Sequence, residues 1–112
     1  MTLMDTRVDT QPLADLRNLR RTFEVFGWCQ GRIEDDEGRM CLVGAMSRVA
    51  DVMLDCHGGA FTTRFFALSA ALNAVRPDPD ALIGSVWNDH HARSVDDVYA
   101  IIDAAIAVEE SA

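Results

Sequence analysis

Apolar residues recur at steps of three and four along most of the chain, and this spacing limits the fold more than any other feature. Such steps place the apolar side chains on one face of an α-helix. Alternating strand patterns are nearly absent. Four segments keep the helical period, at about residues 12–26, 42–56, 61–75 and 95–106. The sequence therefore predicts an all-α domain of four main helices.

Residues that start or stop helices stand at the ends of these segments. Pro12 suits the first turn of a helix, and Gly27 follows the last residue of the first apolar stripe. The second and third segments are followed by stop signals, His57-Gly58-Gly59 and the proline-containing stretch 76–80. Short helical turns are expected at 81–86. Residues 1–11 are interpreted as an N-terminal arm and residues 12–112 as a single helical domain.

The first and last helices carry additional signals. In the first, Asp15, Arg20 and Glu24 are predicted on the outer face, with Arg20 and Glu24 at pairing distance. In the last, Ser94 is a favourable N-cap and Asp97 is placed to complete a capping box.

A glycine-rich acidic loop is predicted between the first two helices. Gly27, Gly31 and Gly38 interrupt any regular element there, and residues 34–37 are all acidic. A short strand or hairpin is expected at about 32–33. Irregular connections of this kind favour an irregular or orthogonal bundle over a regular up-and-down bundle.

Charge and cysteine content exclude several classes of function. The net charge is −8, and an acidic surface repels nucleic-acid phosphate and anionic lipid. No apolar run reaches the roughly 20 residues of a membrane helix. Three cysteines without a signal-peptide pattern favour reduced thiols in the cytoplasm. All ten basic residues are arginine, which favours a GC-rich source.

Most chemically versatile side chains lie in the segments 27–31, 38–45 and 87–94, which we call the signature segments. One interpretation is a pocket in which Trp87 stacks on a planar ligand, Asn88 and Asp89 hydrogen-bond it, and Arg93 holds an anion. The alternative is structural: Trp87 anchors the core, and Arg93 pairs with Asp89. The candidate ligand or partner site comprises Trp28, Cys41, Trp87, Asn88, Asp89 and Arg93.

The cysteines allow two further hypotheses. Cys41 opens the second helix, where the helix dipole favours a reactive thiolate, but a small buried residue is the favoured interpretation. A zinc site would need Cys29, Cys41, Cys56 and His57, whose gaps do not match the close pairs of structural zinc sites. We therefore predict no metal, no cofactor and no catalytic residue.

The signature segments resemble a family of small uncharacterised proteins from actinobacteria and their phages. The resemblance covers roughly residues 13–108 and implies a helical cytosolic domain without an assigned activity. Ser94 stands where that family often has Thr, and His90-His91 have no counterpart in its pattern. The resemblance rests on Trp28-Cys29-Gln30-Gly31, Gly38, Cys41-Leu42-Val43-Gly44-Ala45, Trp87-Asn88-Asp89, Arg93-Ser94 and Asp97-Val98.

These observations favour a non-enzymatic protein-interaction or regulatory module that binds a protein partner, with a homodimer as one form. The apolar faces that would serve are Phe61, Phe65 and Phe66, or Val98, Tyr99, Ile101 and Ile102. The alternative is a small-molecule-binding protein or cysteine-dependent enzyme. Its pocket would lie where the signature segments meet, with Cys41 exposed.

Overall fold

The computed structural model describes residues 10–52 and 58–111. Over these residues the chain is mostly helical and contains no β-strand, which confirms the all-α prediction. The elements are α1 (Gln11–Phe26), α2 (Leu42–Val52), α3 (Gly58–Asn73), the π-helix η2 (Trp87–His91) and α4 (Val95–Glu110). The predicted N-terminal arm lies almost entirely outside the described residues, so its boundary stays a prediction. No helix of the described part is long and apolar enough to cross a membrane.

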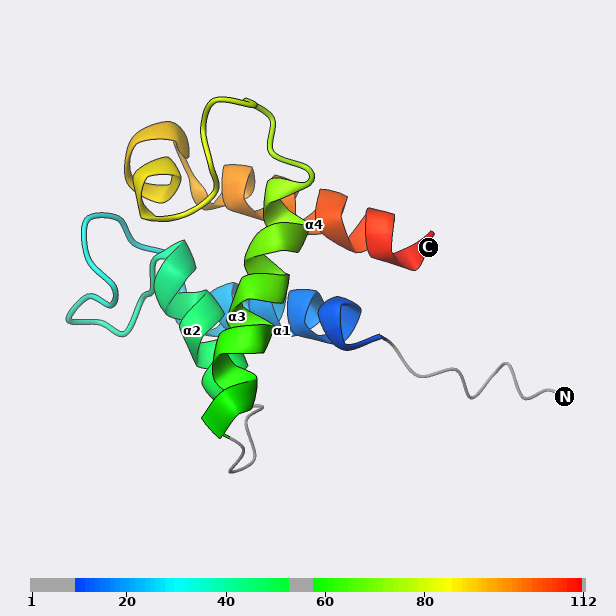
Figure 1. Cartoon of the computed structure of the whole chain (residues 1–112). Helices are drawn as coiled ribbons and strands as arrows, with labels where there is room; N and C mark the ends of the chain where they lie inside the picture. Colours follow the sequence, from blue (N-terminus) through cyan, green and yellow to red (C-terminus); the bar gives the residue numbers. More distant parts are fainter. Residues whose placement is uncertain (1–9, 53–57, 112) are drawn as a thin grey trace, which may run out of the picture.

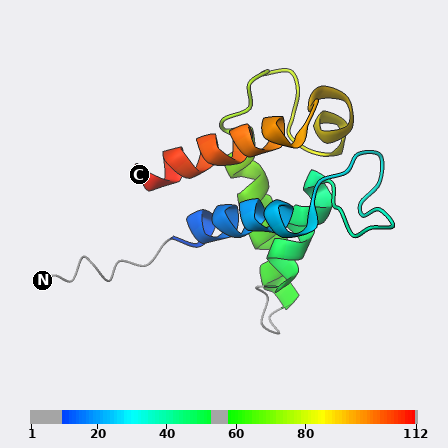
Figure 2. The same cartoon turned by 180° about the vertical axis from the view of Figure 1, so that it is seen from behind.

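Helices α1 and α4 run side by side in opposite directions, and α3 lies across them (Figures 1 and 2). Ion pairs join the outer edges of the antiparallel pair, from Arg20 to Asp103 and from Arg17 to Glu110. Helix α2 packs against both α1 and α3. The core fills the space between the four helices and includes Leu16, Leu19, Phe23, Leu42, Met46, Val49, Leu68, Leu72, Trp87, Val98 and Ile102.

Helix α1 begins and ends where the sequence indicates. The Thr10 hydroxyl accepts a hydrogen bond from the Leu13 amide, and Gly27 ends the helix with φ +90°, a conformation that favours glycine. Two side chains on this helix differ from the prediction. Asp15 is buried rather than outward-facing because Arg64 of α3 pairs with it at 2.7 Å. Phe26, assigned to the apolar stripe, is 38% exposed.

The boundary between α2 and α3 was predicted less well. Helix α3 begins at Gly58, so Gly58 and Gly59 lie in its first turn and do not end the preceding helix. The predicted end of the second helix, from residue 53 to Cys56 and His57, lies outside the described residues. The third helix ends at Asn73, whose side-chain oxygen accepts from the Ile83 amide and so closes the following loop.

The segment before α4 forms a π-helix that the sequence did not reveal. The Ala92 amide donates to the Trp87 carbonyl at 2.9 Å, which closes the five-residue turn η2. Ser94 occupies the predicted N-cap of α4, but its hydroxyl makes no capping bond. Asp97 instead accepts from the Arg93 amide at 2.9 Å.

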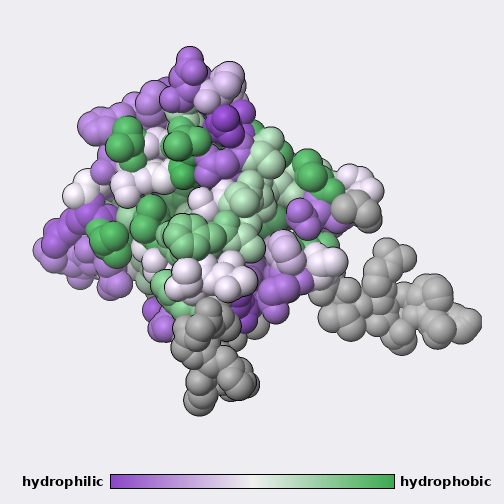
Figure 3. Space-filling view, viewed as in Figure 1, coloured by the Kyte–Doolittle hydropathy of each residue, from purple (hydrophilic) through white to green (hydrophobic). Residues whose placement is uncertain are grey.

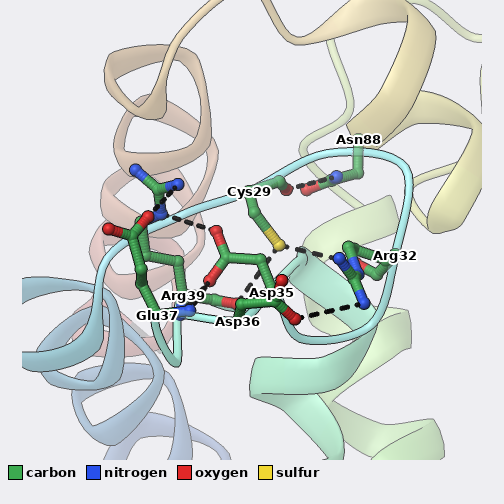
Figure 4. A network of polar contacts seen from close by, with 7 residues as sticks. All are labelled: Cys29, Arg32, Asp35, Asp36, Glu37, Arg39 and Asn88. Atoms are coloured by element: carbon green, nitrogen blue, oxygen red, sulfur yellow. Dashed lines mark hydrogen bonds and ion pairs between the residues drawn. The ribbon is translucent and has the colours of Figure 1, made fainter.

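The loop between α1 and α2 is irregular, as predicted, and is held by side chains (Figure 4). Asp35 accepts hydrogen bonds from the Glu37 and Arg39 amides, and the Arg39 guanidinium pairs with it at 2.6 Å. Isolated bridges from Met40 to Trp28 and Glu34 replace the expected hairpin at 32–33.

Candidate functional site

The structure brings the signature segments together, and Asn88 joins them. Its side chain lies in η2 and is 0% exposed. The amide oxygen accepts from Trp28 Nε1 at 2.7 Å and from the Leu42 amide at 3.0 Å. The amide nitrogen donates to the Cys29 carbonyl at 3.1 Å and to Asp89 Oδ1 at 2.9 Å. An asparagine side chain offers two donors and two acceptor positions, so no capacity remains for a ligand.

Asp89 and Gln30 extend this contact. Asp89 Oδ1 also accepts from the Gly31 amide at 2.9 Å. The Gln30 side-chain amide donates to the carbonyls of Asn88 at 2.9 Å and Ala92 at 3.0 Å. The carbonyls at the end of a π-helix have no helical partners. Gln30, from the loop between α1 and α2, supplies the hydrogen-bond donor for them. We call the group Trp28, Gln30, Gly31, Leu42, Asn88 and Asp89 the Asn88 clasp.

The hydrogen bonds of the clasp act on the charge of Asp89. The Gly31 amide, followed by the Asn88 side chain, holds the pKa of Asp89 below its ordinary value, while slight desolvation opposes this shift. Asp89 is therefore an anion at neutral pH that is already bound by two donors. A general acid or base would need a higher pKa at this position.

Cys41 is buried, with 4% of its surface exposed. It precedes α2, and its Sγ accepts a hydrogen bond from the Gly44 amide at 3.3 Å, so the thiol caps the helix. Among the described residues no histidine hydrogen-bonds to this sulfur. Cys41 is therefore the small buried residue that the sequence favoured, and the exposed Cys41 of the alternative pocket interpretation is not found.

Cys29 is buried beside the acidic loop. Its Sγ lies 3.2 Å from the Arg39 carbonyl oxygen and 3.5 Å from that of Arg32 (Figure 4). Burial raises the pKa of the Cys29 thiol, and the neighbouring charge of Asp35 raises it further. A raised pKa disfavours the thiolate needed for nucleophilic attack or metal binding. The described residues contain no group of three potential metal ligands, and Cys56 and His57 lie outside them.

The remaining candidates lie apart from the clasp. Trp87 is 4% exposed and packs in the core. Arg93 has an 88% exposed side chain and pairs with Asp97, so the predicted pair with Asp89 is not formed. A depression of about 480 Å³ includes Trp87, His91, Arg93 and Asp97, whereas Trp28 and Cys41 are not part of it.

A separate depression of about 230 Å³ lies where the signature segments meet. Its lining is formed by Gly31, Arg32, Ile33, Cys41, Ser85 and Asp89. Within it the Asp89 carboxylate and the Cys41 thiol already have hydrogen-bond partners. Whether any of the six candidate residues touches a ligand or partner stays a prediction.

The role of Gln30 and the saturation of Asn88 were not predicted from the sequence. The signal for both is the clustering of Asn, Gln and Trp beside glycines. Buried amide side chains must find partners, and loop backbone groups supply them. The same cluster can therefore indicate a structural contact as readily as a binding site.

Comparison with known proteins identifies the chain at the level of a family. No curated protein and no solved structure matches it. A family model described as a family of unknown function, DUF6197, matches residues 7–108. That match includes α1, α2, α3, α4 up to residue 108, and both sides of the Asn88 clasp. The chain therefore belongs to the DUF6197 family.

Proposed function

We propose that the protein is a non-enzymatic interaction module that associates through the outer face of α3, with a second copy of the chain as the partner. One observation carries this proposal. The exposed side chains along that face are all uncharged in a chain of which 25% is charged. They are Thr62, Thr63, Phe66, Ala67, Ala70 and, just after the helix, Ala74.

The spacing of these residues places them on one continuous face. Steps of three and four residues keep side chains on the same side of a helix. Phe66 is 65% exposed at its middle and contacts Phe65 edge-on, with ring centroids 5.9 Å apart. In Figure 3 apolar and neutral side chains cover the centre of the face on which α3 lies, and hydrophilic ones gather at its edges.

A second copy fits this face better than a charged partner does. Each copy carries a net charge of −8, so two copies repel where acidic surfaces meet. The α3 face brings no charge to the contact, and its alanines allow a close approach between helices. The outer edges of α1 and α4 carry exposed ion pairs and would place charges in such an interface.

The second apolar face suggested by the sequence is unsuited to binding. Val98, Ile101 and Ile102 are 1%, 6% and 0% exposed, because α4 presents them to the core. Phe65 is also half-buried and packs against the core. Ile102→Asp should therefore unfold the protein instead of releasing a monomer.

Analytical ultracentrifugation over a range of concentrations tests the proposal. We expect the mass to rise from 12.3 kDa toward twice that value for the parent, and Phe66→Glu to remain monomeric. Leu82→Glu is the matched control, because Leu82 is 68% exposed but lies outside the α3 face. A parent that is monomeric throughout, or a Phe66→Glu variant that dimerises equally well, would refute the proposal.

We further propose a cytoplasmic location and an actinobacterial or phage origin. The absence of lysine among ten basic residues supports a GC-rich source. Sequencing of the genomic region from which the chain derives would test the origin. Phage structural or regulatory genes on either side are expected, and an isolated gene in an AT-rich genome would contradict it.

A further inference from the structure

The arginines of the described residues differ in their partners. Six form ion pairs with carboxylates: Arg17, Arg20, Arg32, Arg39, Arg64 and Arg93. Arg76 donates to the backbone carbonyls of Asn73 and Pro79. Arg21 and Arg48, both exposed, pair with no carboxylate of the described part.

Arg21 and Arg48 border the same apolar groove. This groove, of about 240 Å³, lies between the C-terminal half of α1 and the middle of α2. In Figure 2 the C-terminal end of α1 lies beside α2. The lining is mainly apolar and comprises Asn18, Arg21, Thr22, Val25, Phe26, Arg48 and Val49.

The apolar walls of the groove are open to solvent. Val25 is 67% exposed and Phe26 is 38% exposed. The Arg48 guanidinium lies over the Phe26 ring, 4.5 Å from its centroid. A guanidinium over an aromatic ring keeps N–H donors for a carboxylate, and Arg48 pairs with none of the described carboxylates. Arg21 is one helical turn before Val25 and carries a second cation along the same wall.

We propose that this groove binds an acidic amphipathic helix of a partner protein. The apolar face of that helix would cover Val25, Phe26 and Val49, and its carboxylates would pair with Arg21 and Arg48. A groove between two helices with an apolar floor suits this mode of recognition. Charge complementarity selects the acidic class, since the unpaired charges of the groove are positive. Nucleic acid is disfavoured because the protein as a whole is acidic.

Binding of an acidic helix in the groove is independent of the proposed self-association. The groove lies on α1 and α2, and none of its lining residues belongs to the α3 face. Phe66→Glu should therefore leave groove binding unchanged, and changes in the groove should leave the dimer unchanged.

The test is a fluorescence-anisotropy titration with a labelled amphipathic peptide of leucine and glutamate. The same design with lysine in place of glutamate is the control peptide. We expect the acidic peptide to bind in the groove and the basic peptide not to bind there. Added salt should weaken the complex with the acidic peptide. Arg21→Gln with Arg48→Gln should weaken binding about tenfold, as expected for two partly exposed charge pairs.

The matched control protein is Arg32→Gln with Arg93→Gln. It removes the same charge from two exposed arginines that are not part of the groove, and should bind the acidic peptide like the parent. Amide chemical shifts should change at 18–26 and 45–49 on binding. The inference would be overturned if the acidic peptide did not bind, or if both double variants lost the same affinity for it. Chemical-shift changes confined to α3 would also overturn it.

Discussion

At the scale of single residues, the side chain of Asn88 uses its whole hydrogen-bonding capacity inside the protein. Trp28 Nε1 and the Leu42 amide share its oxygen, and both lose their acceptor if the amide is removed. Unsatisfied buried donors cost about 1–3 kcal/mol each. Asn88→Ala should therefore lower the free energy of unfolding by about 2–4 kcal/mol, measured by urea denaturation.

Asn18→Ala is the control for this measurement. Asn18 is half-exposed, and within the described residues its side chain makes no hydrogen bond. The free energy of unfolding of Asn18→Ala should differ little from that of the parent. Equal losses in the Asn18 and Asn88 variants would show that the saturation of Asn88 does not stabilise the fold.

Asp89 gives a pH dependence at the same scale. Its pKa is lowered in the folded protein by the Gly31 amide and then by the Asn88 side chain. A carboxylate with a lowered folded pKa contributes stability that is present above its unfolded pKa of about 3.9 and lost as pH falls through the folded pKa. The urea concentration at the unfolding midpoint should therefore fall less steeply for Asp89→Asn than for the parent as the pH is lowered from about 5 to about 2. An unchanged acid profile in Asp89→Asn would contradict this contribution, although Asp35 and Asp97 also have lowered pKa values and add to the parent profile.

At the scale of elements, the close approach of α2 to the preceding loop depends on Gly44. A Cβ at this position would lie 2.5 Å from the Ile33 carbonyl oxygen, which itself accepts from the Cys41 amide. Backbone must move to relieve such a contact. Gly44→Ala should lower the free energy of unfolding by about 1–3 kcal/mol.

Gly84→Ala is the matched control for Gly44→Ala. A Cβ at Gly84 meets nothing within 4 Å, and its φ is not positive. Gly84→Ala should leave stability unchanged or raise it slightly by restricting the unfolded chain. Thermal denaturation should give a lower melting temperature for Gly44→Ala than for Gly84→Ala. The reverse order would contradict this packing.

The helices were predictable from the sequence to different degrees. The α1 ends were predicted within about one residue because the apolar spacing coincides with Pro12 at the start and Gly27 at the end. The start of α3 was missed, since Gly58 and Gly59 normally stop helices but here begin one. The π-helix η2 was missed because its extra residue per turn has no distinct apolar period.

At the scale of the whole molecule, ion pairs and hydrogen bonds between distant residues determine which polar side chains are buried, and sequence patterns do not show this. Asp15 was assigned to solvent by its position on α1, yet Arg64 of α3 draws it into the interior. The structure brings together four of the six candidate site residues. Trp28, Asn88 and Asp89 belong to the clasp and Cys41 lies beside it, whereas Trp87 packs in the core and Arg93 pairs with Asp97. Spacing along the chain does not encode these tertiary partners.

Burial of the cysteines yields a prediction for the molecule as a whole. Cys29 is 9% exposed and Cys41 is 4% exposed, so reagents reach either thiol only after the structure opens. Iodoacetamide labelling, followed by peptide mass spectrometry, should modify both residues slowly in the native protein and rapidly in urea. Rapid native labelling of Cys41 would revive the cysteine-enzyme hypothesis.

The central claim is that the signature segments form a structural clasp around Asn88. Hydrogen exchange of the Trp28 indole N–H, followed by NMR, tests it most directly because that proton is donated to Asn88 Oδ1 while its ring is only half-buried. We predict that it exchanges only through opening with a free energy close to that of global unfolding. Exchange near the rate of a free indole would contradict the clasp and leave Asn88 available for a ligand.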